Sequence, residues 1–188
     1  MYQRILHTLS ILLIFITQSS FYKRQHTDAF QEVINHRTDS TVKKQLIKYQ
    51  LGGVEKSVET ENYDVEKVIE FAKTFIGTPH IMSGTSKKGM DCSGLIMIVH
   101  KEYGVILPHS SHEQGRYGTV IASVDSLERG DLLFYYSSYN SSNFITHVGI
   151  YLGDGTFIHA SASGGVIITK FSDNYWRTKY LFATRFNS

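Results

Sequence analysis

The chain has 188 residues, 41% of them hydrophobic, and its 19 Lys and Arg against 17 Asp and Glu give a net charge of +2. This length fits one globular domain with an extension. So small and scattered a charge gives no reason to expect nucleic acid as a partner, and a single cysteine excludes both an internal disulfide and a zinc site built on paired cysteines.

The first twenty residues differ from the rest of the chain. Arg4 precedes an apolar stretch over residues 9–16, and small polar residues follow it. This order is typical of a secretory signal peptide, and the apolar run is short for a membrane span. We therefore predict a signal peptide over residues 1–20 and export to the periplasm or cell envelope, with an uncleaved N-terminal anchor as the alternative. A lipid anchor would require a cysteine directly after the apolar run, and the sequence has none there.

Residues 21–61 are polar and show only two short apolar faces that suit helices. The sequence "LGGVEKSVETEN" at 51–62 indicates a break. We predict a linker or prosegment over 21–61 and one domain over 62–188. The apolar residues of the two faces are Ala29, Phe30, Val33 and Ile34, and then Val42, Leu46 and Ile47.

From residue 63 onward the patterns become regular. Apolar residues at helical spacing predict an amphipathic helix that ends at Gly77 and Pro79. Asp91 is a good N-cap for a second helix, which runs to about Tyr103 and is apolar on every side, so we expect it to be buried. Alternating strand patterns then follow, and the order predicts an α+β domain with an antiparallel sheet. The predicted strands are 131–136, 147–152, 156–161, 165–171 and 181–186.

The only cysteine, Cys92, is predicted to be the first residue of the buried helix. There the positive end of the helix dipole and the free backbone N–H groups favour thiolate, so we expect its pKa to lie below the usual value near ~8.5. An exported protein has little use for a stray thiol in an oxidising compartment. The alternative is a small apolar residue that only packs in the core.

Two of the nine histidines stand out by their spacing. His100 lies on the buried helix and is expected to be structural, whereas His109 and His112 lie in a polar segment and are expected to be solvated. His147 and His159 flank "VGIYLGDGTFI", the pattern of a hairpin. These two imidazoles can therefore be tested against strand geometry.

A three-residue loop, residues 153–155, pairs Ile150 with Ile158 and gathers the aliphatic side chains on one face. It leaves His147 and His159 together on the other face as diagonal neighbours, about 7–8 Å apart and able to meet. A two-residue loop would mix the two faces. The aliphatic pattern therefore predicts a histidine pair, although two structural histidines could also be neighbours by chance.

A thiol at a helix start with a paired imidazole is the arrangement that nucleophilic acyl transfer requires. In this hypothesis Cys92 attacks a carbonyl, His147 carries the proton, and His159 fixes the tautomer and tilt of His147. The competing chemistry is a zinc site in which the same three side chains are ligands.

Five segments of the sequence resemble the NlpC family of papain-like cell-wall cysteine peptidases, most of all its murein endopeptidases. The resemblance covers about residues 62–188 and implies a buried nucleophile helix packed on a five- to six-stranded antiparallel sheet. It also implies a peptidoglycan peptidase with nucleophile Cys92, base His147 and third polar residue His159, which works without a metal or other cofactor. The segments are "GTPHIMSGTSKKGMDCSGLI", "LPHSSHEQ", "RGDLLFY", "THVGIYLGDGTFIHASASGGV" and "YWRTKY".

One position departs from the family pattern. His80 stands where the family usually has a tyrosine that helps to hold the oxyanion, so we predict that an imidazole N–H donates there instead, or that His80 is a passive loop residue. The resemblance also suggests Asp91, Ser93 and Ser110 as substrate contacts, although Asp91 could equally be only an N-cap. Several tyrosines, Tyr139 among them, could line a substrate wall or simply pack.

The leading function is therefore an exported, monomeric endopeptidase that acts on peptidoglycan peptides. The alternatives are a thiol acyltransferase or amidase of the same fold, a catalytically impaired wall-binding module, and the zinc protein. The scissile bond is either the cross-link between D-alanine and diaminopimelate or the γ-D-glutamyl bond within one stem. We expect no nucleic acid and no metal as partners.

Overall fold

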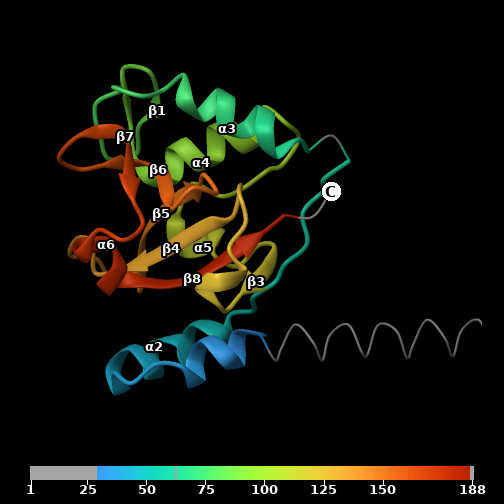
Figure 1. Cartoon of the computed structure of the whole chain (residues 1–188), viewed down its shortest axis with the longest axis vertical. Helices are drawn as coiled ribbons and strands as arrows, with labels where there is room; N and C mark the ends of the chain where they lie inside the picture. The colour runs from blue at the N-terminus through green and yellow to red at the C-terminus, as the bar shows by residue number, and fades with distance from the viewer. Residues whose placement is uncertain (1–28, 62, 187–188) are drawn as a thin grey trace, which may run out of the picture.

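A computed structural model describes residues 29–61 and 63–186, which form helices packed on a six-stranded antiparallel sheet (Figure 1). The predicted α+β class is confirmed. The predicted signal peptide lies outside the described residues. Within the described part of the chain, no helix is both long and apolar enough to cross a membrane.

The sheet has the strand order β3-β8-β4-β5-β6-β7, and every neighbouring pair is antiparallel. The five predicted strands are all present, with bounds within two residues of those expected. The edge strand β3 was not predicted, because three residues are too few to show alternation. The bounds are β3 Thr119–Ile121, β4 Leu132–Tyr136, β5 Ile145–Tyr151, β6 Thr156–Ser161, β7 Gly165–Lys170 and β8 Tyr180–Arg185. A small hairpin, β1 Thr85–Ser86 and β2 Gly89–Met90, precedes the main sheet in the chain.

The described part of the chain contains five α-helices besides a helical segment over residues 29–35. They are α2 Ser40–Leu51, α3 Val65–Lys73, α4 Cys92–Lys101, α5 Ser111–Gln114 and α6 Asn174–Lys179, with a single 3-10 turn over Val124–Ser126. The predicted amphipathic helix is α3, whose Val68, Ile69 and Ala72 are buried. In the view of Figure 1, α3 and α4 lie on one side of the strands, and α2 lies at the opposite end of the molecule.

Helix α4 begins and is buried as the sequence predicts. The Asp91 side chain accepts a hydrogen bond from the Gly94 N–H at 2.7 Å, which satisfies one of the free N–H groups of the first turn. Leu95, Ile96 and Val99 are fully buried, and the helix packs against β5 and β6. Since α4 begins at residue 92, this packing fixes the position of the sole cysteine relative to β5.

The N-terminal helices pack on the core of the domain. Phe30 is fully buried and contacts the ring of Phe182 on β8 edge to face, with centroids 5.2 Å apart. Leu46 and Tyr49 of α2 are buried in the same cluster. The described part of the segment predicted as a linker or prosegment is therefore packed on the domain and is helical over residues 29–35 and 40–51. The domain boundary at residue 62 stays a prediction.

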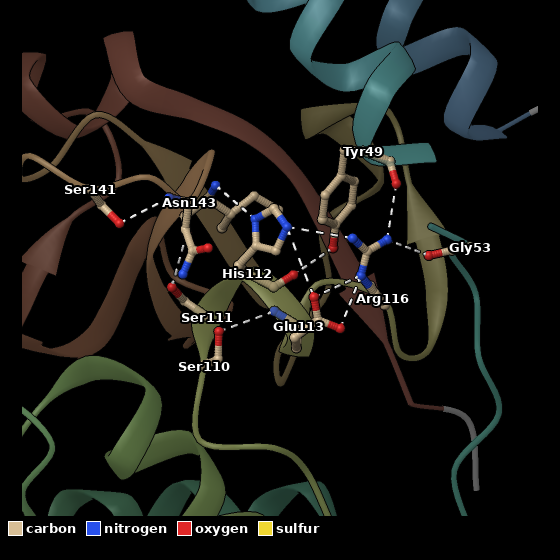
Figure 2. Close-up of polar contacts among 10 residues, drawn as sticks. Tyr49, Gly53, Ser110, Ser111, His112, Glu113, Arg116, Ser141 and Asn143 are labelled. Carbon is tan, nitrogen blue, oxygen red and sulfur yellow. Dashed lines mark hydrogen bonds and ion pairs between the residues drawn. The ribbon is translucent and has the colours of Figure 1, made fainter. Parts of the chain in front are cut away.

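A buried arginine ties α2 to α5 (Figure 2). The Arg116 guanidinium donates to the carbonyl oxygens of Tyr49 and Gly53 at 2.9 and 2.8 Å, lies over the Tyr49 ring and pairs with Glu113. The His112 ring packs edge to face on Tyr49 and lies beside the guanidinium. The expectation that His112 is solvated is therefore wrong, because α2 covers it.

Candidate active site

A cavity of about 460 Å³ opens at the N-terminus of α4. Its lining comes from this helix, from β5 and β6, from the loop between β4 and β5, and from α6. Of the seven side chains predicted for the site, five line it: His80, Asp91, Cys92, Ser93 and His147. His159 lies directly behind His147, and Ser110 lies outside the lining.

The cysteine points from α4 toward β5. The Cys92 side chain is 7% exposed, and its Sγ lies 3.9 Å from the carbonyl oxygen of Thr146, the residue before His147. A register shift between β4 and β5 leaves Thr146 as an extra residue, because Tyr135 pairs with His147 whereas Tyr136 pairs with Ile145. The bulge therefore lies where β5 comes nearest to the Cys92 sulfur.

Burial changes the expected ionisation of this thiol. The pKa of Cys92 is raised to about 12, mainly by burial and also by the neighbouring Asp91 carboxylate, although hydrogen bonds from backbone N–H groups at the helix start and at Val148 act to lower it. The prediction of a lowered pKa was therefore wrong. The helix terminus acts in the expected direction, but loss of hydration outweighs it.

The predicted histidine pair is present. Ile150 pairs with Ile158 and Tyr151 with Phe157, as the three-residue loop requires. His147 Nε2 lies 2.8 Å from His159 Nδ1. Gly149, two residues after His147 on β5, lies against β6, where a Cβ would be only 2.9 Å from the Ile158 carbonyl oxygen and 3.1 Å from the His159 Cβ. A side chain at residue 149 would therefore push the two strands apart where the imidazoles meet.

The hydrogen-bond chain continues to a third residue that the sequence did not predict. His159 Nε2 lies 2.9 Å from the Thr169 hydroxyl on β7. When His147 donates from Nε2, His159 accepts at Nδ1 and donates from Nε2 to Thr169, which leaves His147 Nδ1 free to accept a proton. Thr169 is the diagonal neighbour of His159, which pairs with Ile167, so the rule that predicted the histidine pair could have found it.

A second missed residue is Trp176 of α6, the only tryptophan of the chain. Its ring packs on both imidazoles, with centroids 4.5 Å from His147 and 4.7 Å from His159, and it lines the cavity. Burial lowers the pKa of His159 to about 3 and holds the pKa of His147 well below its ordinary value, with smaller contributions from His159 and His80. The resting site therefore combines a neutral thiol with neutral imidazoles.

Asp91 and Ser93, on either side of Cys92, form hydrogen bonds that hold the loop before α4 in place. The buried Asp91 carboxylate accepts from the Gly94 and Ser83 N–H groups and from the Ser93 hydroxyl, and it pairs with His109 Nε2 at 3.0 Å. Asp91 is thus the N-cap of α4 and the anchor of the preceding loop. Ser93 lines the cavity, but its hydroxyl hydrogen points to Asp91.

Two further predicted residues have different placements. Ser110 is the N-cap of α5, where its Oγ accepts from the Glu113 N–H at 3.4 Å, so the structure does not bring it to the cleft. His80 lines the cavity, and its backbone pairs with Met90, two residues before the cysteine. This pairing fixes the His80 loop beside the start of α4.

The donor arrangement does not fit the zinc alternative. Among the described residues, no three His, Cys, Asp or Glu side chains are arranged to hold a metal ion. His147 Nε2 and both nitrogens of His159 are committed to the hydrogen-bond chain that ends at Thr169. The two histidines of the zinc alternative therefore hydrogen-bond to each other and to Thr169, which leaves them poorly placed to act as metal ligands.

Comparison with protein families places this geometry in context. Residues 77–185, more than half of the chain, match the NlpC/P60 family, so the chain belongs to that family. It is 36% identical over 126 residues to the murein DD-endopeptidase MepS/murein LD-carboxypeptidase of Escherichia coli, a match that covers 66% of this chain and 64% of that protein. It is also 36% identical over 123 residues to the γ-DL-glutamyl hydrolase of Bacillus subtilis, covering 64% of this chain and 29% of that enzyme.

Solved structures agree with the assignment. An NlpC/P60 family protein from Bacillus cereus superposes with a TM-score of 0.62 at 31% identity, over 68% of this chain and 42% of that one. An NLP/P60 family protein from Staphylococcus aureus superposes with a TM-score of 0.60 at 31% identity, over 77% and 48%. The fold is the papain-like NlpC/P60 fold that the resemblance implied. The chain spans less than two thirds of the length of each of these relatives.

Proposed function

We propose that this protein is a cysteine endopeptidase that hydrolyses peptide bonds in the stem peptides or cross-links of peptidoglycan. In this proposal Cys92 is the nucleophile, His147 the general base and His159 the residue that orients it. One observation carries the assignment: Cys92 and His147 line the same cavity, while His147 is held by its far nitrogen at 2.8 Å from His159. The E. coli relative, named for murein endopeptidase activity, supports the substrate class.

The protonation states define the first step. Because the thiol and the imidazole are both neutral at rest, the Cys92 proton moves to His147 Nδ1 as Sγ attacks the carbonyl carbon. The new C–S bond turns the carbonyl oxygen into an oxyanion. The free N–H groups at the start of α4 and the His80 side chain are the donors proposed for the oxyanion. The imidazolium that forms is stabilised by the face of Trp176 and by donation from Nε2 to His159.

The second half of the reaction reverses the proton path. The tetrahedral intermediate collapses when His147 gives its proton to the leaving amine, which leaves a thioester on Cys92. Water, deprotonated by the same imidazole, then attacks the thioester, releases the new carboxylate and returns the proton to the sulfur.

The setting of this activity is part of the proposal. The N-terminal sequence pattern supports export to the periplasm or cell envelope, through a signal peptide over residues 1–20 or an uncleaved anchor. We propose a monomer that uses no metal or other cofactor and binds peptidoglycan peptide rather than nucleic acid. The low net charge of +2 is in keeping with that choice.

Digestion of purified peptidoglycan sacculi, followed by mass spectrometry of the products, tests the function. We expect new free amines from the wild-type protein and none from Cys92→Ala. Mass analysis also identifies the bond, because cleavage at D-alanyl–diaminopimelate and at γ-D-glutamyl–diaminopimelate leave different fragments. Products joined to an added amine instead of water would indicate an acyltransferase. Wall binding by both proteins without any cleavage would indicate a binding module.

A further inference from the structure

A second cavity, of about 510 Å³, lies beside the catalytic one. Its wall is the loop between β4 and β5, "SSYNSSNF" at residues 137–144, together with Gln45 of α2. Tyr139 lines both cavities, and Thr146 of the second cavity directly precedes His147 of the first. A ligand that extends from the catalytic cavity past Tyr139 would therefore enter this space.

The loop that forms this wall is tied at its base. Lys179 of α6 donates to the carbonyl oxygen of Ser137 at 2.6 Å, and the Tyr175 hydroxyl donates to that of Ser138 at 3.0 Å. The Ser138 N–H donates to the Thr146 hydroxyl at 2.9 Å. Figure 2 shows Ser141 and Asn143 near α5, and the Asn143 N–H donates to the Ser141 hydroxyl at 3.0 Å. The loop is therefore held by α6 on one side and by Thr146 of β5 on the other.

The lining is rich in hydrogen-bonding groups and contains no charged side chain. Its amides and hydroxyls come from Gln45, the two asparagines and the serines of the loop, and its aromatic faces come from Tyr136, Tyr139 and Phe144. Tyr136 and Phe144 are packed on each other, with ring centroids 6.0 Å apart. Among the described residues, the side-chain amides of Gln45 and Asn140 are exposed and have no hydrogen-bond partner, so they are free to bind a ligand.

We propose that this second cavity binds the glycan strand of the substrate, a chain of N-acetylated amino sugars, while its stem peptide occupies the catalytic cavity. The inference rests on the proposed function. Neutral amides and hydroxyls complement sugar hydroxyl and acetamido groups, and aromatic rings suit the apolar faces of pyranoses. A stem peptide, whose carboxylates and amines call for charged partners, fits this lining less well. Because each stem peptide is attached to a sugar, the adjacent position of the two cavities suits one continuous ligand.

Titration of the wild-type protein with a peptide-free tetramer of N-acetylglucosamine, followed by amide NMR, tests the site. We expect saturable shifts in residues 139–144 and at Gln45. Asn140→Ala and Gln45→Ala should each weaken binding by about threefold to tenfold, the usual effect of losing one or two hydrogen bonds. Asn35→Ala is the matched control, since this exposed asparagine lies outside the cavity, and it should bind as the wild type does.

A kinetic comparison separates this inference from the proposed function. A muropeptide that carries its disaccharide should be cut with a higher kcat/KM than the same peptide without sugar, and Asn140→Ala should reduce that advantage. If neither substrate is cut, the proposed function fails while the sugar titration still decides the glycan site. The inference is overturned if the sugar gives no saturable shift, if it shifts only the catalytic cavity, or if sugar-free stem peptide added to Cys92→Ala fills the second cavity instead.

Discussion

Acid should destabilise this protein through a buried histidine on α4, the helix that begins at Cys92. His100 is fully buried at the end of α4, where Nδ1 lies 2.8 Å from the Ile96 carbonyl oxygen, so this nitrogen donates, and the ring stacks on Tyr63. Burial lowers the pKa of His100 to about 4, whereas in the unfolded chain it returns to about 6.5. Between these values the unfolded state holds a proton that the folded state does not, so stability is lost as the pH falls.

The size of the effect follows from the two pKa values. Their difference of about 2.5 units gives a loss of about 3 kcal/mol on going from about pH 7 to about pH 4, from this residue alone. His100→Asn removes the titrating group but keeps an N–H that can reach the Ile96 carbonyl. The free energy of unfolding of this variant should therefore fall by about 3 kcal/mol less than that of the wild type over the same pH interval. The two buried site histidines titrate in both proteins and cancel in the comparison.

Urea unfolding, followed by the fluorescence of the lone Trp176, measures these free energies at a series of pH values. The comparison uses the pH dependence rather than the absolute stability, because the smaller Asn side chain also leaves a void that destabilises at every pH. Equal pH dependence of the wild type and His100→Asn would refute the argument that burial keeps this imidazole neutral.

Three further substitutions test other parts of the structure. His80→Ala should lower kcat by about 10²–10³ if the imidazole donates to the oxyanion, whereas the kcat of His80→Tyr should equal or exceed that of the wild type. A wild-type kcat in His80→Ala would contradict the oxyanion role of His80. Thr169→Val removes the hydroxyl that accepts from His159, so kcat should fall by about tenfold, whereas Thr169→Ser keeps the hydroxyl and should have the wild-type kcat. Equal kcat values for the two variants would show that the hydroxyl is not used. Arg116→Ala leaves the carbonyl oxygens of Tyr49 and Gly53 unpaired, so the free energy of unfolding should fall by about 2–4 kcal/mol and residues 29–56 should become sensitive to limited proteolysis. Arg116→Lys should restore only part of this stability. Unchanged proteolysis of Arg116→Ala would contradict the role of this residue in holding α2.

Local chemistry explains which elements could be predicted from the sequence. The start of α4 follows from the Asp91 N-cap, and the hairpin of β5 and β6 follows from aliphatic alternation that only an odd loop preserves. That register was enough to predict the contact between His147 and His159. In each case the signal lies within about twenty residues of the feature it predicts.

The remaining features depend on contacts between distant segments. The pKa of Cys92 depends on how deeply α4 is buried against β5, which no local pattern reports. Trp176 reaches the imidazoles only because the short helix α6 lies over the sheet, and Thr169 only because β7 pairs with β6 in one particular register. Likewise, α2 is too weakly amphipathic for its packing on the core to be evident from sequence.

The dependence of Cys92 reactivity on His147 is the most direct test of the proposed mechanism. A stem-peptide analogue that carries a chloromethyl ketone at the scissile carbonyl would be incubated with the wild type and with His147→Ala. Alkylation of Cys92, in which the sulfur displaces chloride and gives up its proton, would be followed by mass spectrometry. Since the thiol is neutral at rest, we expect alkylation to slow by about 10²–10⁴ when the base is removed. Equal alkylation rates in the two proteins would contradict proton transfer from Cys92 to His147.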